Sequence, residues 1–450
     1  MYYKQTELIP HLFRTEYRKI VSVLCKLFGI EHIEIAEDIV SDTFLLASEL
    51  WGLKGLPENP TAWLYVVAKN KTKDYLKRDS LFAQNISKEI KSNAPISEEI
   101  EIDLSVKNIN DSQLAMIFVV CHPCNPAESR IGLALNLLCG FGVEEIANAF
   151  LTNKKVIYKR LQRAKEKLRA EKIKIEQPTL PEIDDRLSTV LMVLYLLFNE
   201  GYYSSSQDIT LRKDICLEAM RLTSLLIDSR ACEGNEQDEE RDVPERSEGN
   251  EQGRARDEAL TKSLAKFSQM NKPFANALLS LLCFQASRFD ARLNQNGEII
   301  LYEEQDTDLW DQELIAKGEY FLNQASQGDK ISKYHLEAGI AYWHTIKADT
   351  KEKWENILQL YNQLLLIEYS PIAALNRTYA LAKANGKKEA IIEAEKIKLT
   401  GNHLYHSLLG ELYTDVDNTK AILHLQNALA LARSRADKMV ISNKICRLGP

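Results

Sequence analysis

Helical periodicity runs through almost every informative stretch of this sequence, and it constrains the fold more than any other feature. Apolar residues recur at spacings of three and four, whereas alternating β-branched runs joined by short glycine turns are nearly absent. This pattern predicts an all-α protein. With 450 residues, the chain has room for about three domains.

Several classes of protein are disfavoured by the composition. The longest apolar run, residues 189–198, falls well short of the ~18 residues that a membrane span needs. The first residues carry neither a signal-peptide core nor an arginine-rich transit pattern. The eight cysteines are spread thinly, whereas disulfide-built domains are short and cysteine-dense. We therefore expect reduced thiols and a cytoplasmic protein.

Glycine, proline and polar stretches divide the chain into three helical regions. The first covers residues 1–80 and is followed by a polar, acidic linker at 81–110. A smaller region covers 111–175, and the third covers 182–450. Within the third, residues 233–258 hold 11 acidic and four basic side chains and almost no apolar ones, so we predict a disordered insert there.

Charge is distributed unevenly along the chain. Residues 1–175 carry 25 Lys and Arg against 22 Asp and Glu, while the remainder carries 32 against 42. The formal net charge of −7 therefore combines a front part at +3 with a back part at −10. A basic front part favours contact with a polyanion, and an acidic back part does not.

The strongest local signal is a basic helix near the end of the second region. Ten basic and two acidic residues lie between Lys154 and Lys174, after a turn at Thr152 and Asn153 that can cap a helix. With the two short helices before it, this is typical of a helix-turn-helix, whose last helix reads base edges while Lys and Arg neutralise phosphates. The alternative is a structural hairpin with a solvated basic face. The expected apolar stripe is Val156, Ile157, Leu161, Ala164 and Leu168.

A second basic helix is predicted to begin at Pro60. Its five Lys and Arg side chains, between residues 69 and 78, are interleaved with Trp63, Tyr65 and Tyr75. Cations next to aromatic rings suit a nucleic-acid strand whose bases are unstacked. A core tryptophan with solvent-exposed lysines would give the same pattern.

Upstream, residues 36–51 form a predicted amphipathic helix. This pattern alone indicates no particular function, because any surface helix would show it. We expect Ile39, Phe44, Ala47 and Trp51 to face the core, with Glu37, Asp38, Ser41 and Asp42 outward.

Taken in order, the three segments resemble the extracytoplasmic-function (ECF) class of bacterial RNA polymerase sigma factors. Region 2 of that family contains a D-x-x-x-D/E-x-F pattern that binds the polymerase clamp, and Asp38, Asp42 and Phe44 match it. The resemblance implies a contact with the RNA polymerase core through this helix. The implied contact residues are Glu37, Asp38, Ser41, Asp42 and Phe44.

The next helix is similar to the family pattern W-L-x-x-x-A-x-N-x-x-x-D-x-x-R, which opens and holds the −10 element of the promoter. The matching residues are Trp63, Leu64, Ala68, Asn70 and Asp74, followed by the basic pair Lys77 and Arg78. The implied −10 DNA-binding residues are Trp63, Lys69, Asn70, Lys73, Asp74, Lys77 and Arg78.

The basic helix near the end of the second region resembles region 4, which reads the −35 element through a helix-turn-helix. Glu145, Arg160 and Arg163 match that region, whereas Val156 and Tyr158 replace the usual Thr and Ser. The promoter sequence therefore does not carry over. The implied −35 DNA-binding residues are Asn153, Lys154, Lys155, Tyr158, Lys159, Arg160 and Arg163.

The remaining sequence resembles the ECF subgroup with a long, tetratricopeptide-like (TPR-like) C-terminal extension, and F-N-E-G-Y at residues 198–202 is the most specific match. The spacing from Leu404 to Leu431 predicts a helical hairpin, and Gly386 is expected in the turn of a preceding one. The resemblance implies a region-two helical bundle, a region-four helix-turn-helix and a C-terminal α-solenoid. The solenoid would regulate the factor or bind a protein or small-molecule partner.

Other functions fit only parts of the sequence. Cys121, His122 and Cys124 offer three ligands, but tetrahedral zinc needs four, so we expect no metal. No nucleophile–base pair or phosphate-binding glycine loop is present in the sequence, so we expect neither catalysis nor a cofactor. A helix-turn-helix regulator or TPR scaffold that acts without polymerase remains the alternative, and charge reversal at Asp38 and Asp42 would separate the two.

Overall fold

A computed structural model of the chain describes residues 5–87, 103–150, 152–176, 180–203, 213–228, 272–292, 300, 302–432 and 435–448. The predicted insert at 233–258 and residues 88–102 of the predicted linker lie outside these ranges. The described residues form helices joined by turns and contain no strand, which confirms the all-α prediction. None of the described helices has the length and apolar character that crossing a membrane requires.

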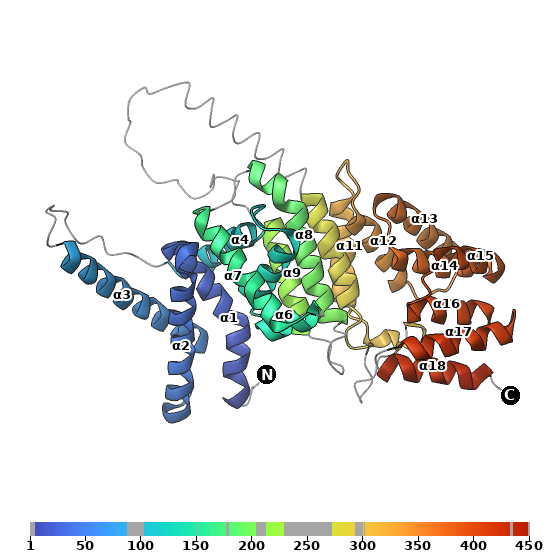
Figure 1. Ribbon diagram of the computed structural model, residues 1–450, viewed down its shortest axis with the longest axis horizontal. Helices are drawn as coiled ribbons and strands as arrows, with labels where there is room; N and C mark the ends of the chain where they lie inside the picture. The colour runs from blue at the N-terminus through green and yellow to red at the C-terminus, as the bar shows by residue number, and fades with distance from the viewer. Residues whose placement is uncertain are drawn as a thin grey trace, which may run out of the picture. The chain divides into compact units, whose positions relative to one another are not determined.

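The chain separates into two compact units, residues 1–193 and 194–450, with the division inside one long helix. The first unit begins with three long helices, shown in blue in Figure 1, and continues with shorter ones. Its elements are α1 (Gln5–Phe28), η1 (Ile30–His32), α2 (Ile33–Lys54), α3 (Pro60–Ser87), α4 (Val106–Val120), α5 (Ala127–Leu137), α6 (Val143–Ala149), α7 (Lys154–Ala170) and the first part of α8 (Leu180–Tyr203).

Local sequence signals determine where the first helices start and stop. Helix α1 ends at Phe28 because Gly29 adopts φ 90°, a left-handed conformation that favours glycine. Helix α3 begins at Pro60, as predicted, and the side chain of Asn59 accepts a hydrogen bond of 3.0 Å from the Ala62 amide. It continues to Ser87, and α4 begins at Val106, so helices occupy both ends of the predicted 81–110 linker.

Burial of apolar stripes holds the first unit together. Helix α2 lies against α1 and α3, with contacts also between α1 and α4. Ile20, Leu24, Ile33 and Leu64 are fully buried among the first three helices. Helices α5, α6 and α7 pack against one another in a second cluster. Its buried residues include Leu133, Ile146, Ile157, Leu161 and Leu168.

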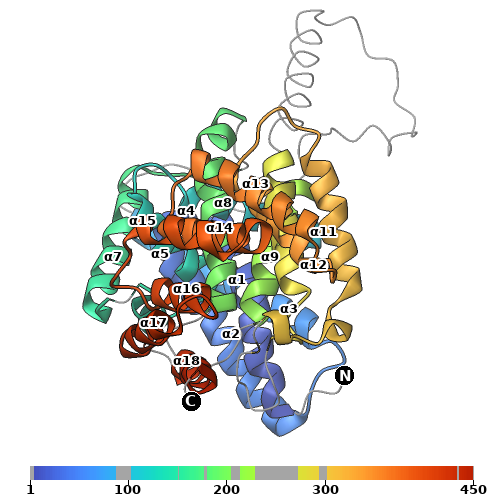
Figure 2. The same cartoon turned by 90° about the vertical axis from the view of Figure 1, so that its right-hand side faces the viewer.

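The second unit is a succession of helices in which each packs mainly on its neighbours in sequence. Figure 2 shows α16, α17 and α18 lying one against the next. After α8, its elements are α9 (Lys213–Asp228), a helix over 272–286, η2 (Tyr302–Glu304), η3 (Thr307–Leu309), α11 (Gln312–Ala325), α12 (Lys333–Thr345), α13 (Lys351–Ile367), α14 (Pro371–Asn385), α15 (Lys387–Ile397), α16 (His403–Tyr413), α17 (Asn418–Leu431) and α18 (Arg435–Leu448).

The helical hairpin predicted at Leu404–Leu431 is confirmed by α16 and α17. The buried residues of the two helices include Leu409, Gly410, Tyr413, Ala421, Leu425 and Ala428. A Cβ atom on Gly410 would lie 2.7 Å from Cγ of Leu425, so the close approach of the two helices requires glycine there. The predicted turn at Gly386 joins α14 to α15 with φ 102°.

Candidate nucleic-acid interface

Helix α2 presents an acidic outer face. Its buried stripe includes Ile33, Ala36, Val40 and Ala47, so residues on the opposite side face solvent. Three of the predicted polymerase-binding residues, Asp38, Ser41 and Asp42, are exposed there. Leu45 is 61% exposed three residues after Asp42 and extends the same face. This exposed leucine was not singled out in the sequence, although its i+3 spacing from Asp42 marks the position.

The other two predicted polymerase-binding residues, Glu37 and Phe44, are turned inward. Phe44 is only 5% exposed, and its ring contacts Phe13 edge-on at 5.2 Å between centroids. Glu37 is half-buried and accepts a hydrogen bond of 2.9 Å from Arg18. These two side chains therefore support the helix from within, as predicted for Phe44 but not for Glu37.

Helix α3 exposes a stripe that contains most of the predicted −10 residues. Its exposed side chains recur at helical spacing, while Leu64, Ala68 and Thr72 are buried on the other side. Trp63, Lys69 and Lys73 are half-buried at the edges of the stripe. The exposed members are Val66, Asn70, Asp74, Lys77 and Arg78, of which Val66 is a position that was not predicted.

Three contacts fix the orientation of α3 on the other two helices. The ring of Trp63 meets that of Trp51 edge-on, with 5.3 Å between centroids. The Tyr65 hydroxyl donates a hydrogen bond of 2.7 Å to Glu16 on α1, and Lys71 lies 3.4 Å from the carboxylate of Asp42 on α2. Trp63 is therefore partly a packing residue, and the Asp42 carboxylate is linked to the same helix that carries the basic stripe.

Helix α7 begins where the sequence predicts. The Asn153 side chain accepts a hydrogen bond of 2.8 Å from the Lys155 amide, so it caps the helix. Ile157, Leu161, Ala164 and Leu168 are buried, which confirms these members of the predicted stripe. Val156, which was included in that stripe, is 45% exposed. At about 100° of turn per residue, it lies outside the arc that the four buried residues occupy.

Opposite the buried stripe, α7 carries a row of exposed cations. Lys155, Lys159 and Arg163 are exposed, and none forms an ion pair within the described part of the chain. Their spacing of four residues places them in one row along the helix. Tyr158, 60% exposed, lies beside this row. The row can meet a polyanion without breaking an existing ion pair.

Two further predicted −35 residues make exchangeable surface contacts. The ammonium group of Lys154 lies 2.6 Å from the Glu144 carboxylate on α6, and the guanidinium of Arg160 lies 2.9 Å from Glu128 on α5. Both glutamates are more than half exposed, and such surface pairs contribute only about 0–1 kcal/mol. A phosphate could replace either carboxylate at little cost.

The far end of α7 contacts α2. Lys165 lies 3.7 Å from the Glu37 carboxylate, which also binds Arg18, and Arg169 pairs with Glu34. The basic residues of α7 therefore have different surroundings at its two ends. The first turns face solvent, and the last turns attach the helix to the acidic start of α2.

The Cys121–Cys124 turn is a packing feature in this structure. Cys121 is buried, and burial raises the pKa of its thiol to about 12. The His122 ring accepts a hydrogen bond of 3.2 Å from the Cys124 amide, and its pKa is lowered by burial and by nearby Arg186. Among the described residues, no group of three or more His, Cys, Asp or Glu side chains is placed to hold a metal ion.

Comparison with known families covers the helices α2 and α3, whereas α7 lies outside both matched regions. Residues 12–81, which include α2 and most of α3, match the model of sigma-70 region 2. Residues 186–238 and 247–326 match DUF6596, a family of unknown function. The chain therefore joins a sigma-70 region 2 domain to a DUF6596 region, a combination that supports a sigma-70-family factor. A region 2 domain implies contact with the RNA polymerase core and promoter DNA during transcription initiation.

Among individual proteins, the chain is similar to an uncharacterized protein of Rhizobium meliloti (strain 1021). The two are 29% identical over 423 residues, which cover 93% of this chain and 90% of that protein. No solved structure matches the chain significantly.

Proposed function

We propose that this protein is an ECF-class sigma factor that directs RNA polymerase to specific promoters and has no catalytic activity or cofactor of its own. The observation that carries the proposal is the sigma-70 region 2 match, which covers the helices that bear the acidic α2 face and the basic α3 stripe. We also propose that the protein acts in the cytoplasm, where the polymerase is found.

In this proposal, the exposed face of α2 binds the clamp of the polymerase β′ subunit. Asp38 and Asp42 supply the charge that attracts a basic partner surface, and Leu45 supplies apolar area between them and the end of the helix. Phe44 supports this face from the core.

The stripe on α3 holds the unpaired strand of the −10 element. Lys77 and Arg78 are placed to meet phosphates, while Asn70 offers an amide that can donate to and accept from base edges. Trp63, half-buried against Trp51, leaves part of its ring for a flipped base.

Helices α6 and α7 act as the helix-turn-helix of region 4, with α7 in the major groove at the −35 element. Support comes from the capped start of α7 and from its row of exposed cations, which form no ion pair with the described residues. Asn153 and Tyr158, near the start of the helix, are the candidates for base contacts, while the cations neutralise phosphates. The second unit, which we interpret as a TPR-like solenoid, regulates promoter engagement by binding a partner.

The experiment that tests this function measures binding of purified core RNA polymerase to the full chain. Reversing two charges on α2, Asp38→Lys with Asp42→Lys, should weaken binding by at least about tenfold because like charges then face each other. The matched control, Glu171→Lys with Glu176→Lys, makes the same change in net charge at exposed positions beyond α7. It should bind like the unmodified chain.

The outcome separates the proposal from a DNA-binding regulator that acts without polymerase. If the unmodified chain fails to bind core polymerase, or if both double variants bind equally well, the α2 face is not a polymerase contact. DNA binding that persists without any polymerase binding would favour the regulator.

A further inference from the structure

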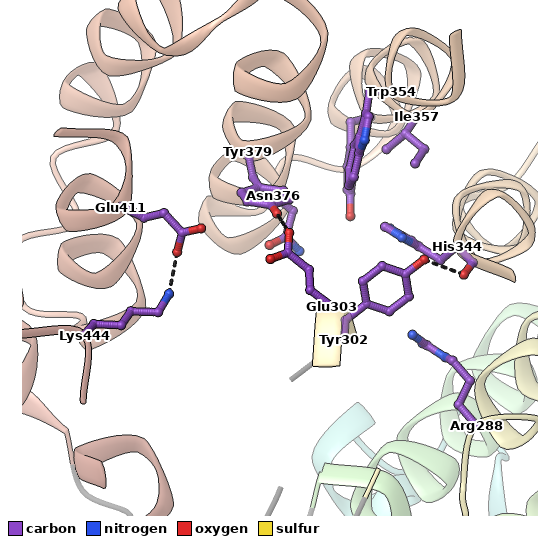
Figure 3. Close-up of a pocket in the computed structure, with 11 residues that line it drawn as sticks. Arg288, Tyr302, Glu303, His344, Trp354, Ile357, Asn376, Tyr379, Glu411 and Lys444 are labelled. Atoms are coloured by element: carbon purple, nitrogen blue, oxygen red, sulfur yellow. Dashed lines mark hydrogen bonds and ion pairs between the residues drawn. The ribbon is translucent and has the colours of Figure 1, made fainter. Parts of the chain in front are cut away.

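The second unit contains a cavity of about 370 Å³ whose lining comes from segments far apart in the sequence. Arg288 follows the helix over 272–286, Tyr302 lies in η2, and His344 lies in the last turn of α12. Trp354 and Tyr379 come from α13 and α14 (Figure 3). This volume lies in the range of sites for small molecules. The cavity is far in sequence from the three faces assigned above to polymerase and DNA.

The carboxylates that line the cavity already have partners. Glu303 accepts a hydrogen bond of 2.7 Å from the Tyr379 hydroxyl and one of 3.1 Å from Lys383, and these contacts hold the pKa of its carboxyl below the usual value. Glu411 forms an ion pair with Lys444 at one side of the cavity (Figure 3). Neither carboxylate is left to bind a cationic ligand.

Arg288, in contrast, has no ion-pair partner among the residues that the structure describes. Its guanidinium lies 5.5 Å from the centroid of the Tyr302 ring. Lys353, which is 2% exposed, adds a buried positive charge that donates a hydrogen bond of 2.7 Å to a backbone carbonyl. Among the described residues in and beside the cavity, the charge without an ion-pair partner is therefore positive.

His344 provides a neutral polar group inside the same cavity. Its ring lies 5.1 Å from that of Tyr302 and 5.8 Å from that of Trp354. Its buried Nδ1 atom has no hydrogen-bond partner in the part of the chain that the structure describes. Burial, together with the charges of Arg288 and Lys353, lowers its pKa to about 3, so the ring is uncharged at neutral pH. Buried polar atoms are usually paired, so an unpaired one beside a cavity favours a ligand.

The aromatic side chains around these polar groups indicate the shape of the uncharged part of a ligand. Trp354, Tyr302 and Tyr379 offer aromatic surfaces that pack well against a planar ring. We propose that this cavity binds a carboxylate attached to a flat aromatic group, with the carboxylate on Arg288 and the ring among Tyr302, Trp354 and Tyr379. A guanidinium binds a carboxylate through two parallel hydrogen bonds, which suits the position of Arg288.

This proposal rests on the partner-binding role proposed for the second unit, but not on promoter activity. Two kinds of molecule carry a carboxylate and an aromatic ring together: a free aromatic acid, and a peptide that ends in an aromatic residue. Benzoate represents the first, and N-acetyl-phenylalanine, with its amide as the uncharged comparison, represents the second.

The test is calorimetric titration of the full chain, without polymerase or DNA, with benzoate, benzylamine and the two phenylalanine derivatives. Benzoate or N-acetyl-phenylalanine should bind, and benzylamine and the amide should bind more weakly. Arg288→Gln should weaken carboxylate binding by about 10- to 100-fold, the usual effect of losing a charged hydrogen bond. Arg447→Gln, the same change at an exposed position outside the cavity lining, should leave it unchanged.

Binding is read out separately from transcription, so the two proposals can fail independently. Absence of carboxylate binding at up to about 10 mM, where even free energies near −3 kcal/mol are detectable, would overturn this proposal and leave the promoter function untouched. Tighter binding of benzylamine than benzoate, or an Arg288→Gln variant that binds like the unmodified chain, would also overturn it. Preference between benzoate and N-acetyl-phenylalanine identifies the source of the carboxylate.

Discussion

Removing the row of exposed cations on α7 is the most informative perturbation of the proposed DNA contact. Lys155, Lys159 and Arg163 face solvent opposite the buried stripe, so their replacement by Ala removes no packing. Alanine also has the highest helix propensity, so α7 should remain intact. The triple variant therefore separates the charge of this face from the fold that presents it.

The expected size of the effect follows from the number of cations. Each phosphate contact that is neutralised contributes about 0.9 to the slope of log affinity against log salt, so three contacts contribute about 2.7. A fourfold rise in salt, from about 50 to 200 mM, should then weaken the unmodified chain about 40-fold more than the triple variant. At low salt the variant should already bind more weakly.

The assay is fluorescence anisotropy of a labelled, mixed-sequence duplex titrated with the full chain at several salt concentrations. A control variant that replaces Lys107, Lys330 and Lys388 with Ala loses the same charge at exposed positions in other helices and loops. It should retain the slope of the unmodified chain. Equal slopes for the unmodified chain and the α7 variant would refute the assignment of this face to DNA.

Two further predictions concern the second unit. Gly410→Ala places a Cβ atom 2.7 Å from Leu425, so urea denaturation should show a loss of about 1–3 kcal/mol, whereas Gly401→Ala, with open space around it, should be neutral. Burial raises the pKa of Glu337 to about 7 in the folded protein. As pH rises, its carboxyl therefore ionises in the unfolded chain before it ionises in the folded one. The unit should lose up to about 3 kcal/mol of stability between pH 4.5 and 7, and Glu337→Gln should abolish this loss in urea melts at pH 5 and 8.

The helices were predictable because their signals are local. Pro60 and Asn153 mark helix starts through their own backbone chemistry, and Gly386 marks a turn that needs a left-handed residue. The hairpin of α16 and α17 followed from the spacing of small and large residues. The exposure of Val156 shows the limit of this reasoning, because one position along a helix moves a side chain by about 100°.

The tertiary contacts were not predictable from spacing. Glu37 lies on the polar side of a predicted amphipathic helix, yet the structure pairs it with Lys165, 128 positions further along the chain. The cavity of the second unit likewise combines Arg288, His344 and Tyr379 from separate segments, and no motif in the sequence links them. Such sites depend on how helices pack, which a periodicity of three and four does not specify.

Transcription by purified core polymerase from a pool of genomic DNA fragments, with sequencing of the RNA 5′ ends, tests the central claim most directly. The account predicts new 5′ ends only when the full chain is present, each preceded by the same two DNA elements at a fixed separation. An identical set of 5′ ends with and without the protein would contradict it.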